Sequence, residues 1–148
     1  MNILVITPIS HIKGVEAKLN SLGNVAYFDD PLYADILPLI SEYDVIFTNP
    51  NKSKIFIGKD LIDQAKKIQI ICTASTGTNH IDVDYARKKN IKILSLTKEI
   101  DTINKISSTA EHAFALTLSS LRNIVPACKH VLENKWNYEK FIGRQFSE

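Results

Sequence analysis

The stretch KIQIICTASTGTNHID, residues 67–82, decides the fold class of this chain. It places an apolar run, IQIICT (68–73), directly before a polar loop that contains Gly77. The loop ends at Asp82, and aspartate is one of the residues that helices prefer at their N-cap. A buried strand that leads through a short loop into a helix is the beginning of a βα unit.

The same alternation of apolar strand and helical segment runs through the first hundred residues. Strands are predicted over 2–7, 24–28, 44–48, 68–73 and 91–96, and helices over 15–22, over 59–67 and from Asp82 onward. Near-continuous apolar strands separated by helices are typical of a parallel sheet that is covered on both faces. The sequence therefore predicts an α/β fold: a flavodoxin-like, doubly wound parallel sheet of about five strands.

The last third of the chain breaks this alternation and predicts a long helix. Ser108 and Glu111 have the spacing of a capping box, in which each side chain accepts the other residue's backbone N–H. The segment that follows, AFALTLSSL (113–121), is apolar on nearly all sides, so this helix needs covering on more than one side. Pro126 breaks or restarts the helix, which we expect to continue to about Lys135.

Composition excludes several classes of function. The net charge of +2 over 148 residues argues neither for nor against a nucleic-acid partner. The densest basic cluster, Arg87–Lys89, is the expected cationic end of a helix rather than a phosphate-binding patch, and we predict no nucleic-acid partner. No apolar stretch approaches the ~20 residues of a membrane span, so we predict no membrane partner. Cys72 and Cys128 form no C-x-x-C pair, so we expect no metal site and a cytoplasmic location.

The loop Ala74–Asp82 falls at the carboxyl edge of the predicted sheet, where open parallel sheets bind ligands. The backbone N–H groups of Thr76, Gly77 and Thr78 could form a concave site for a carboxylate or a phosphate. Gly77 would either turn the backbone with a positive φ or let a ligand approach closely. From the residues alone, an ordinary polar turn is the alternative for the loop. For His80 the alternatives are a ligand or acid/base role and a residue of the same polar turn.

The glycine-rich motifs that bind the phosphates of nucleotides are missing from this sequence. Its glycines stand only at 14, 23, 58, 77 and 143, so it contains no G-x-G-x-x-G motif and no P-loop. The chain by itself therefore offers no standard cradle for the pyrophosphate of a dinucleotide.

From residue 68 onward, the order of motifs resembles the D-isomer-specific 2-hydroxyacid dehydrogenases, the group of phosphoglycerate, glycerate and D-lactate dehydrogenases. KIQIICTASTGTNHID resembles the strand and the G-x-G-x-D-N-I-D loop of that family, with Ser75 in place of the first glycine and Asn79-His80 in place of the Asp-Asn pair. NIKILSL, SSTAEHAFALTLSSLRNI and ENKW follow in the family's order. The resemblance covers roughly half of the chain.

The resemblance implies roles for two loops. The backbone around Thr76, Gly77 and Thr78 would hold the carboxylate of the substrate. Asn49 and Pro50, which stand where many members have Arg-Ser, would line the other side of that pocket. The missing arginine argues against a phosphorylated substrate.

The resemblance also assigns the rest of the chain. Residues 1–104 would be the amino-terminal part of the substrate-binding (catalytic) domain, and residues 105–148 the linking and dimerisation helix and the start of a truncated dinucleotide-binding domain. Thr109 would lie near the cofactor NAD, with NADP as the alternative. Helix 110–121 would pack in the interface of a homodimer. The family's catalytic Arg, Glu and His would lie beyond Glu148, so we assign no catalytic residue here.

The leading hypothesis is therefore the amino-terminal portion of an NAD-dependent oxidoreductase that acts on the CH–OH group of a small 2-hydroxy acid, or on the matching 2-oxo acid. The chain alone would be inactive. The alternative is a stand-alone flavodoxin-like module that binds a carboxylate or dimerises without catalysis. A phospho-receiver domain would use Lys98, but Thr7-Pro8 and Thr48-Asn49 at the strand ends supply no carboxylate for Mg²⁺. The sequence names neither the particular acid nor the choice between NAD and NADP.

Overall fold

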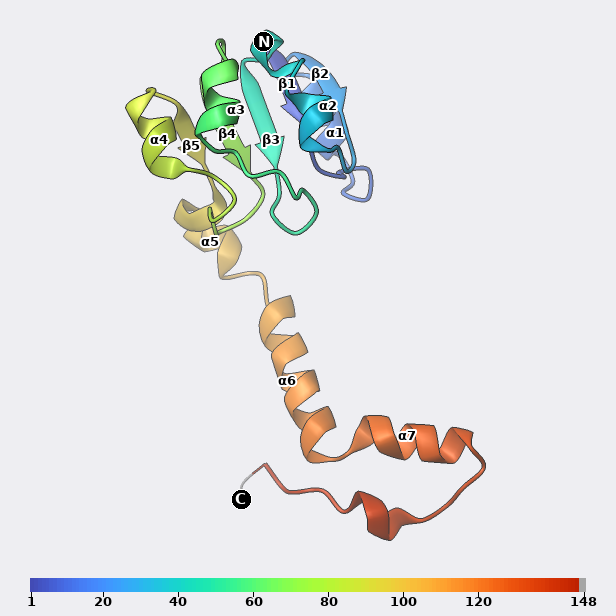
Figure 1. Ribbon diagram of the computed structural model, residues 1–148. Helices are drawn as coiled ribbons and strands as arrows, with labels where there is room; N and C mark the ends of the chain where they lie inside the picture. Colours follow the sequence, from blue (N-terminus) through green and yellow to red (C-terminus); the bar gives the residue numbers. More distant parts are fainter. Residues whose placement is uncertain (147–148) are drawn as a thin grey trace. The chain divides into compact units, whose positions relative to one another are not determined.

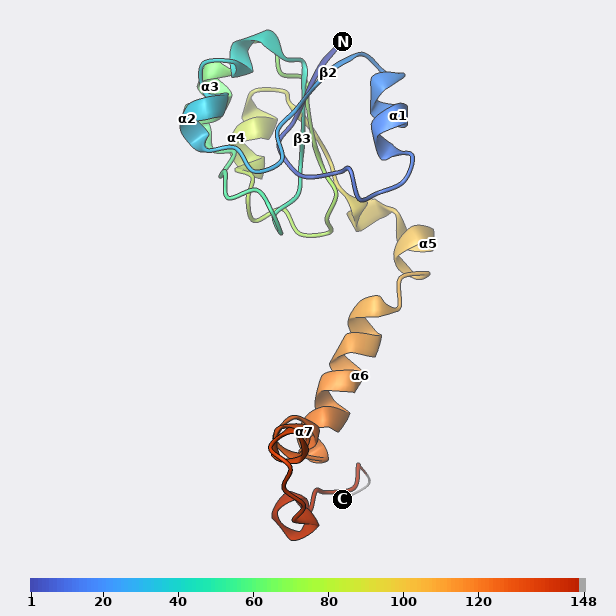
Figure 2. The same cartoon turned by 90° about the vertical axis from the view of Figure 1, so that its right-hand side faces the viewer.

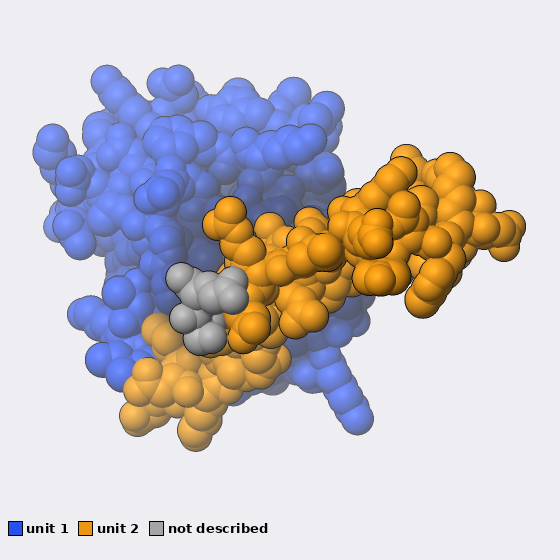
Figure 3. Space-filling model, turned by 90° about the horizontal axis from the view of Figure 1, so that it is seen from below, with its two compact units in different colours: residues 1–100 blue, residues 101–148 orange. Residues whose placement is uncertain are grey.

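The computed structural model describes residues 1–146, in which the chain divides into two compact units. Unit 1 runs from Met1 to Ile100, and unit 2 begins at Asp101 (Figure 3). Unit 1 holds the sheet and unit 2 is helical (Figure 1).

A five-stranded, all-parallel sheet forms the centre of unit 1. Its strands are β1 (Asn2–Val5), β2 (Asn24–Tyr27), β3 (Val45–Thr48), β4 (Ile70–Thr73) and β5 (Lys92–Leu94). Their order in the sheet is β2-β1-β3-β4-β5, and every neighbouring pair is parallel. The predicted flavodoxin-like sheet is confirmed, and each predicted strand contains the shorter observed one.

Helices cover the two faces of this sheet unequally. The helical elements of unit 1 are α1 (Val15–Asn20), α2 (Tyr33–Ile36), η1 (Ile40–Glu42), α3 (Lys59–Gln64), α4 (Val83–Lys88) and η2 (Leu96–Lys98). Figure 2 shows α1 on one side of the strands and α2, α3 and α4 on the other. The helix predicted over 59–67 ends three residues early, and α2 was not predicted from the sequence.

Alternating side chains of the strands build two cores. Leu4, Ile46 and Ile71 are fully buried on the face that α3 covers, where they pack with Leu61 of that helix. On the opposite face, Ile3, Val5 and Val45 pack with the half-buried Val15 and Leu19 of α1. This period of two places Thr48 and Thr73 on the same face as Ile46 and Ile71, because alternate residues of a strand share a face.

Unit 2 consists of α5 (Ile100–Ile103, which begins at the unit boundary), α6 (Ser108–Leu121), α7 (Ile124–Leu132) and the single turn η3 (Tyr138–Phe141). The predicted break lies slightly before Pro126: the helix is interrupted at Asn123, which has φ +53°, and α7 restarts at Ile124. Pro126 therefore lies in the first turn of α7, where its missing N–H costs nothing, and α7 ends at Leu132 rather than near Lys135. The predicted capping box of Ser108 and Glu111 is wrong: the N-cap of α6 is Ser107, no side-chain cap bond forms there, and the Ser107 hydroxyl instead donates to the Glu111 carboxylate.

Unit 2 leaves its large apolar side chains open to solvent. Phe114 is 61% exposed, and Leu132 and Trp136 are each 83% exposed. None of the residues described in unit 2 is buried. Within residues 1–146, no helix has both the length and the hydropathy that a membrane span requires.

Candidate functional site

The loops that follow β3 and β4 begin side by side at the carboxyl edge of the sheet (Figure 1). Thr48 and Thr73, the last residues of these strands, are direct partners in the ladder, and the N–H of Ala74 donates to the carbonyl of Thr48 at 3.0 Å. The structure therefore brings the predicted residues Asn49 and Pro50 to the same edge as the predicted loop Thr76–Thr78.

Three consecutive carbonyl groups of the β4–α4 loop are held by hydrogen bonds. The Ser75 carbonyl accepts the N–H of Leu96 at 3.0 Å, and the Thr76 carbonyl accepts the hydroxyl of Thr97 at 2.8 Å. The Gly77 carbonyl accepts the hydroxyl of Ser75 at 2.7 Å. Residues 96 and 97 belong to η2, so the segment after β5 fixes the path of this loop.

The anchored carbonyls determine where the neighbouring N–H groups point. In a trans peptide the C=O and the following N–H point in opposite directions, and the chain has no cis peptide among its described residues. The N–H groups of Thr76 and Gly77 therefore point away from η2, and that of Thr78 points away from the Ser75 side chain. None of these three donates a hydrogen bond to another described residue. Three unused backbone donors in one exposed loop are suited to an anion.

Gly77 contributes open space rather than an unusual backbone angle. The positive φ considered from the sequence is absent here: among the described glycines, only Gly14 has one, at φ +85°. A Cβ built on Gly77 would meet no heavy atom within 4 Å. The close approach of a ligand to Gly77 stays a prediction.

Side chains within the loop form a hydrogen-bonded chain. The Thr73 hydroxyl lies 2.8 Å from the Ser75 hydroxyl and 3.0 Å from Nε2 of His80. Burial lowers the pKa of His80 below its usual 6.5, because the charged form loses its solvation. The sequence interpretation treated His80 as a turn residue and overlooked Thr73 and Ser75, although hydroxyl residues at alternate positions were a visible signal.

The loop after β3 is a compact turn built on Asn49. Its side-chain oxygen accepts the N–H of Asn51 at 3.0 Å, and its carbonyl accepts the N–H of Ser53 at 3.1 Å. This local use of an asparagine side chain is an Asx turn. Pro50 is exposed at the tip, and the fully buried Thr48 hydroxyl at the base has no hydrogen-bond partner among the described residues.

The remaining predicted site residue, Thr109, belongs to unit 2. It is an exposed residue in the first turn of α6. Among residues 1–146, no three His, Cys, Asp or Glu side chains gather in a way that could hold a metal ion.

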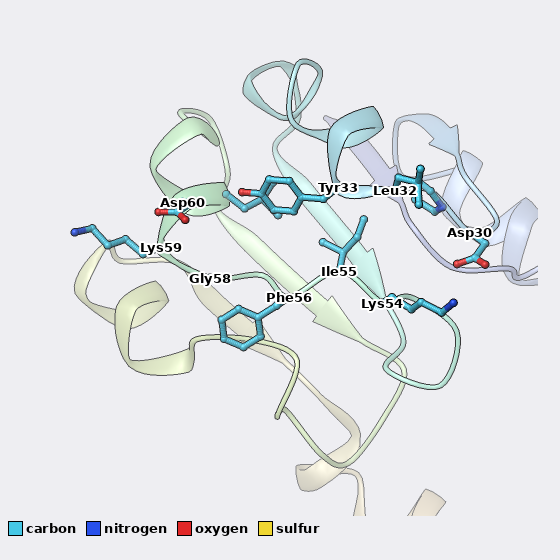
Figure 4. A pocket seen from close by; sticks show the side chains of 11 residues that line it. Asp30, Leu32, Tyr33, Lys54, Ile55, Phe56, Gly58, Lys59 and Asp60 are labelled. Atoms are coloured by element: carbon cyan, nitrogen blue, oxygen red, sulfur yellow. The ribbon is translucent and has the colours of Figure 1, made fainter.

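Unit 1 also has a pocket of about 360 Å³ between the segment that leads into α2 and the segment that leads into α3 (Figure 4). Asp30 and Lys54 stand at one end of it, and Lys59 and Asp60 at the other. Each end thus carries both signs of charge, which gives no concentrated positive potential for a carboxylate. None of its lining residues belongs to the turn at residues 49–53 or to the loop at residues 74–82, so we take that turn and that loop as the candidate site.

Comparisons with known proteins agree with this architecture. A formate dehydrogenase of Pichia angusta is 35% identical over 109 residues, which cover 72% of this chain and 28% of that protein. A D-3-phosphoglycerate dehydrogenase of Synechocystis sp. is 32% identical over 112 residues, which cover 76% of this chain and 19% of that protein. The solved D-lactate dehydrogenase of Aquifex aeolicus, complexed with NAD and lactic acid, shares the fold with a TM-score of 0.79 at 18% identity, over 98% of this chain and 41% of that one.

The chain thus spans less than a third of the length of these two relatives. The profile of one family, described as D-isomer specific 2-hydroxyacid dehydrogenase, catalytic domain, matches residues 3–136. Together with the five-stranded parallel sheet, this match shows that the chain belongs to the D-isomer specific 2-hydroxyacid dehydrogenase family.

Proposed function

We propose that this chain is the amino-terminal portion of an NAD-dependent oxidoreductase that acts on the CH–OH group of a small 2-hydroxy acid or on the matching 2-oxo acid. The observation that carries the proposal is the row of three unused N–H groups at Thr76, Gly77 and Thr78. A carboxylate accepts such donors in charge-assisted hydrogen bonds, which are stronger than neutral ones.

The contribution of this chain is to hold and orient the substrate. A carboxylate bound at residues 76–78 would place the adjacent hydroxyl-bearing carbon at the edge of the sheet, beside the turn at Asn49 and Pro50. Pro50 is exposed there, so this turn is the second wall of the proposed pocket.

NAD, with NADP as the alternative, is the proposed hydride acceptor of the complete enzyme. The Aquifex aeolicus relative in fold was solved with NAD and lactic acid, which supports this choice. The residues of this chain do not fit a dinucleotide by themselves, because they contain no glycine-rich cradle and only Thr109 is a proposed contact. No step of the hydride transfer is therefore assigned to them, and we propose that the chain alone is inactive.

The proposed assembly is a homodimer through helix 110–121. The exposed apolar residues of α6 support it, because surfaces of this kind are covered in stable proteins.

We further propose that residues 1–104 act as the substrate-binding part and residues 105–148 as the link to a dinucleotide-binding domain. A cytoplasmic location is proposed from the two cysteines, both free thiols.

The second candidate function is a module that binds a carboxylate or dimerises without catalysis. The exposed apolar surface of unit 2 favours it, since an interface needs no active site.

Titration with glycolate, the smallest 2-hydroxy acid, tests the proposal. We expect saturable shifts of the amide NMR signals of Thr76, Gly77 and Thr78, and none with ethylene glycol, which has the hydroxyl but no carboxylate. In Gly77→Ala the added methyl meets no protein atom, so the fold should persist while the affinity for glycolate falls about tenfold. Shifts confined to other residues would overturn the assignment.

An NADH absorbance assay separates the two candidate functions. We expect no turnover of glycolate with NAD by this chain, and turnover by the complete protein. Substantial turnover by the chain alone would contradict its proposed inactivity, and none by the complete protein would favour the non-catalytic module.

A further inference from the structure

The direction of each hydrogen bond in the Thr73–Ser75–His80 chain follows from counting protons. A carbonyl oxygen only accepts, so the Ser75 hydroxyl donates its single proton to the Gly77 carbonyl. The 2.8 Å contact between Ser75 and Thr73 must then use the proton of Thr73. With that proton committed, the 3.0 Å contact between Thr73 and His80 must use a proton on Nε2 of the imidazole.

We infer that His80 is a positioning residue of the β4–α4 loop: held as the Nε2–H tautomer, it orients the Thr73 and Ser75 hydroxyls and so fixes the Gly77 carbonyl. We call the hydrogen-bonded side chains of His80, Thr73 and Ser75 the relay. Its hydrogen bonds run in one direction: the imidazole donates to Thr73, Thr73 donates to Ser75, and Ser75 donates to the backbone carbonyl of Gly77. Nothing in the relay donates toward His80: the Gly77 carbonyl, which can only accept, fixes the direction of each bond, and the imidazole supplies the proton that begins the chain.

Both the ring and the backbone of His80 are held in place. The N–H of Ile57 donates to the His80 carbonyl at 2.8 Å, and the N–H of Asp82 donates to the Ile57 carbonyl at 3.0 Å. These bonds flank an isolated parallel bridge between Ile57 and Ile81, both of which are buried. Nδ1 of the ring is itself buried and has no partner among the described residues. Nε2 is therefore the nitrogen through which the ring acts.

The relay acts on the proposed carboxylate site through one peptide. The Gly77 carbonyl and the Thr78 N–H belong to the same trans peptide, so holding the carbonyl on Ser75 aims the Thr78 N–H in the opposite direction. This consequence rests on the proposed function, in which that N–H meets the substrate carboxylate. The tautomer and the hydrogen-bond direction do not depend on it.

The first test is the tautomer of His80, read from long-range ¹H–¹⁵N NMR spectra of this chain at pH 8. We expect a protonated, pyrrole-like Nε2 and a bare, pyridine-like Nδ1. The opposite pattern would overturn the inference, because a bare Nε2 would have to accept the Thr73 proton that the relay needs elsewhere.

The second test removes the middle of the relay without changing its shape. Thr73→Val deletes the hydroxyl, and Thr73→Ser keeps it as the matched control. We expect Thr73→Val to shift the Thr78 amide signal and to weaken glycolate binding about fivefold, the equivalent of one neutral hydrogen bond, and Thr73→Ser to stay within about twofold. Because Thr73 is buried, Ser75→Ala provides a second variant at a half-buried position, with the same expected effects.

The outcomes separate the relay from the proposed function. If the chain does not bind glycolate at all, yet the tautomer and the Thr78 amide shift agree with expectation, the carboxylate site fails and the relay stands. If glycolate binds at residues 76–78 and neither Thr73→Val nor Ser75→Ala changes the Thr78 signal or the affinity, the relay fails and the site stands.

Discussion

Units 1 and 2 use their apolar residues in opposite ways. In unit 1, nineteen apolar residues between Ile3 and Ile91 are buried, in two clusters on either face of one sheet. In unit 2, none of the described residues is buried, although α6 and α7 contain Phe114 and Leu132 among many other apolar side chains.

This difference shows where each unit obtains its stability. Burial of apolar surface is the dominant favourable contribution to folding, so unit 1 has its own core. Unit 2 has no such core among its described residues, and isolated helices of this length are marginal in water, so its helices need an apolar surface to pack against. The proposed dimer interface would supply that surface.

Removing a core side chain from unit 1 should have the largest effect. Ile71 is fully buried, and Ile71→Ala should lower the free energy of unfolding by about 2–5 kcal/mol, through lost burial and the cavity left behind. The matched variant Leu116→Ala in α6, where the side chain is 58% exposed, should change the urea midpoint of unit 1 by much less. Equal losses in the two variants would break the contrast between the units.

A charge on the exposed apolar surface of α6 should have the next largest effect, on association rather than on folding. Phe114→Asp should raise the dimer dissociation constant about a hundredfold in sedimentation experiments, because a carboxylate would be buried without a partner. Ala17→Asp, at an exposed position of α1 in unit 1, is the control and should leave the dimer intact. A wild-type chain that stays monomeric at high concentration would refute the proposed interface.

The smallest effect should come from pH. Burial lowers the pKa of His80 in the folded chain below its ordinary 6.5, so the unfolded chain binds more protons between these two values. The stability contribution is therefore complete above about pH 6.5 and is lost as the pH falls toward the folded pKa. Urea unfolding between pH 7.5 and pH 5.5 should show this loss, and His80→Gln should reduce it.

A histidine outside the core provides the control for that measurement. His112 lies exposed on α6, so His112→Gln should leave the pH dependence of unit 1 as in the wild type. If both substitutions reduce the loss equally, His80 is not its source.

Local sequence patterns predicted the sheet but not the limits of its strands. Ile68 fits the apolar pattern of β4 and is buried, yet its N–H donates to the carbonyl of Ala65 in a turn. It therefore belongs to the core without belonging to the ladder. The four residues of α2, Tyr33–Ile36, are too few to show helical periodicity, which explains why they were not predicted.

The candidate site, likewise, has some features that local sequence predicts and others that depend on residues distant in the sequence. The glycine-containing loop and its position after a strand are local features, and they predicted residues 76–78. The hydrogen bonds from Leu96 and Thr97 depend on β5 lying beside β4, which no local pattern reveals. The sequence therefore predicted where unused N–H groups could occur, and only tertiary structure explains why their carbonyl neighbours are occupied.

The bridge between Ile57 and Ile81 has a consequence for motion. It ties the segment before α3 to the segment before α4 inside the core, with both isoleucines buried. Segments that open easily have few buried contacts and exposed backbone hydrogen bonds, and the His80 end of the loop has neither property. We therefore expect the His80 end of the loop to be held in place by the packing of the domain itself and not to swing like a lid.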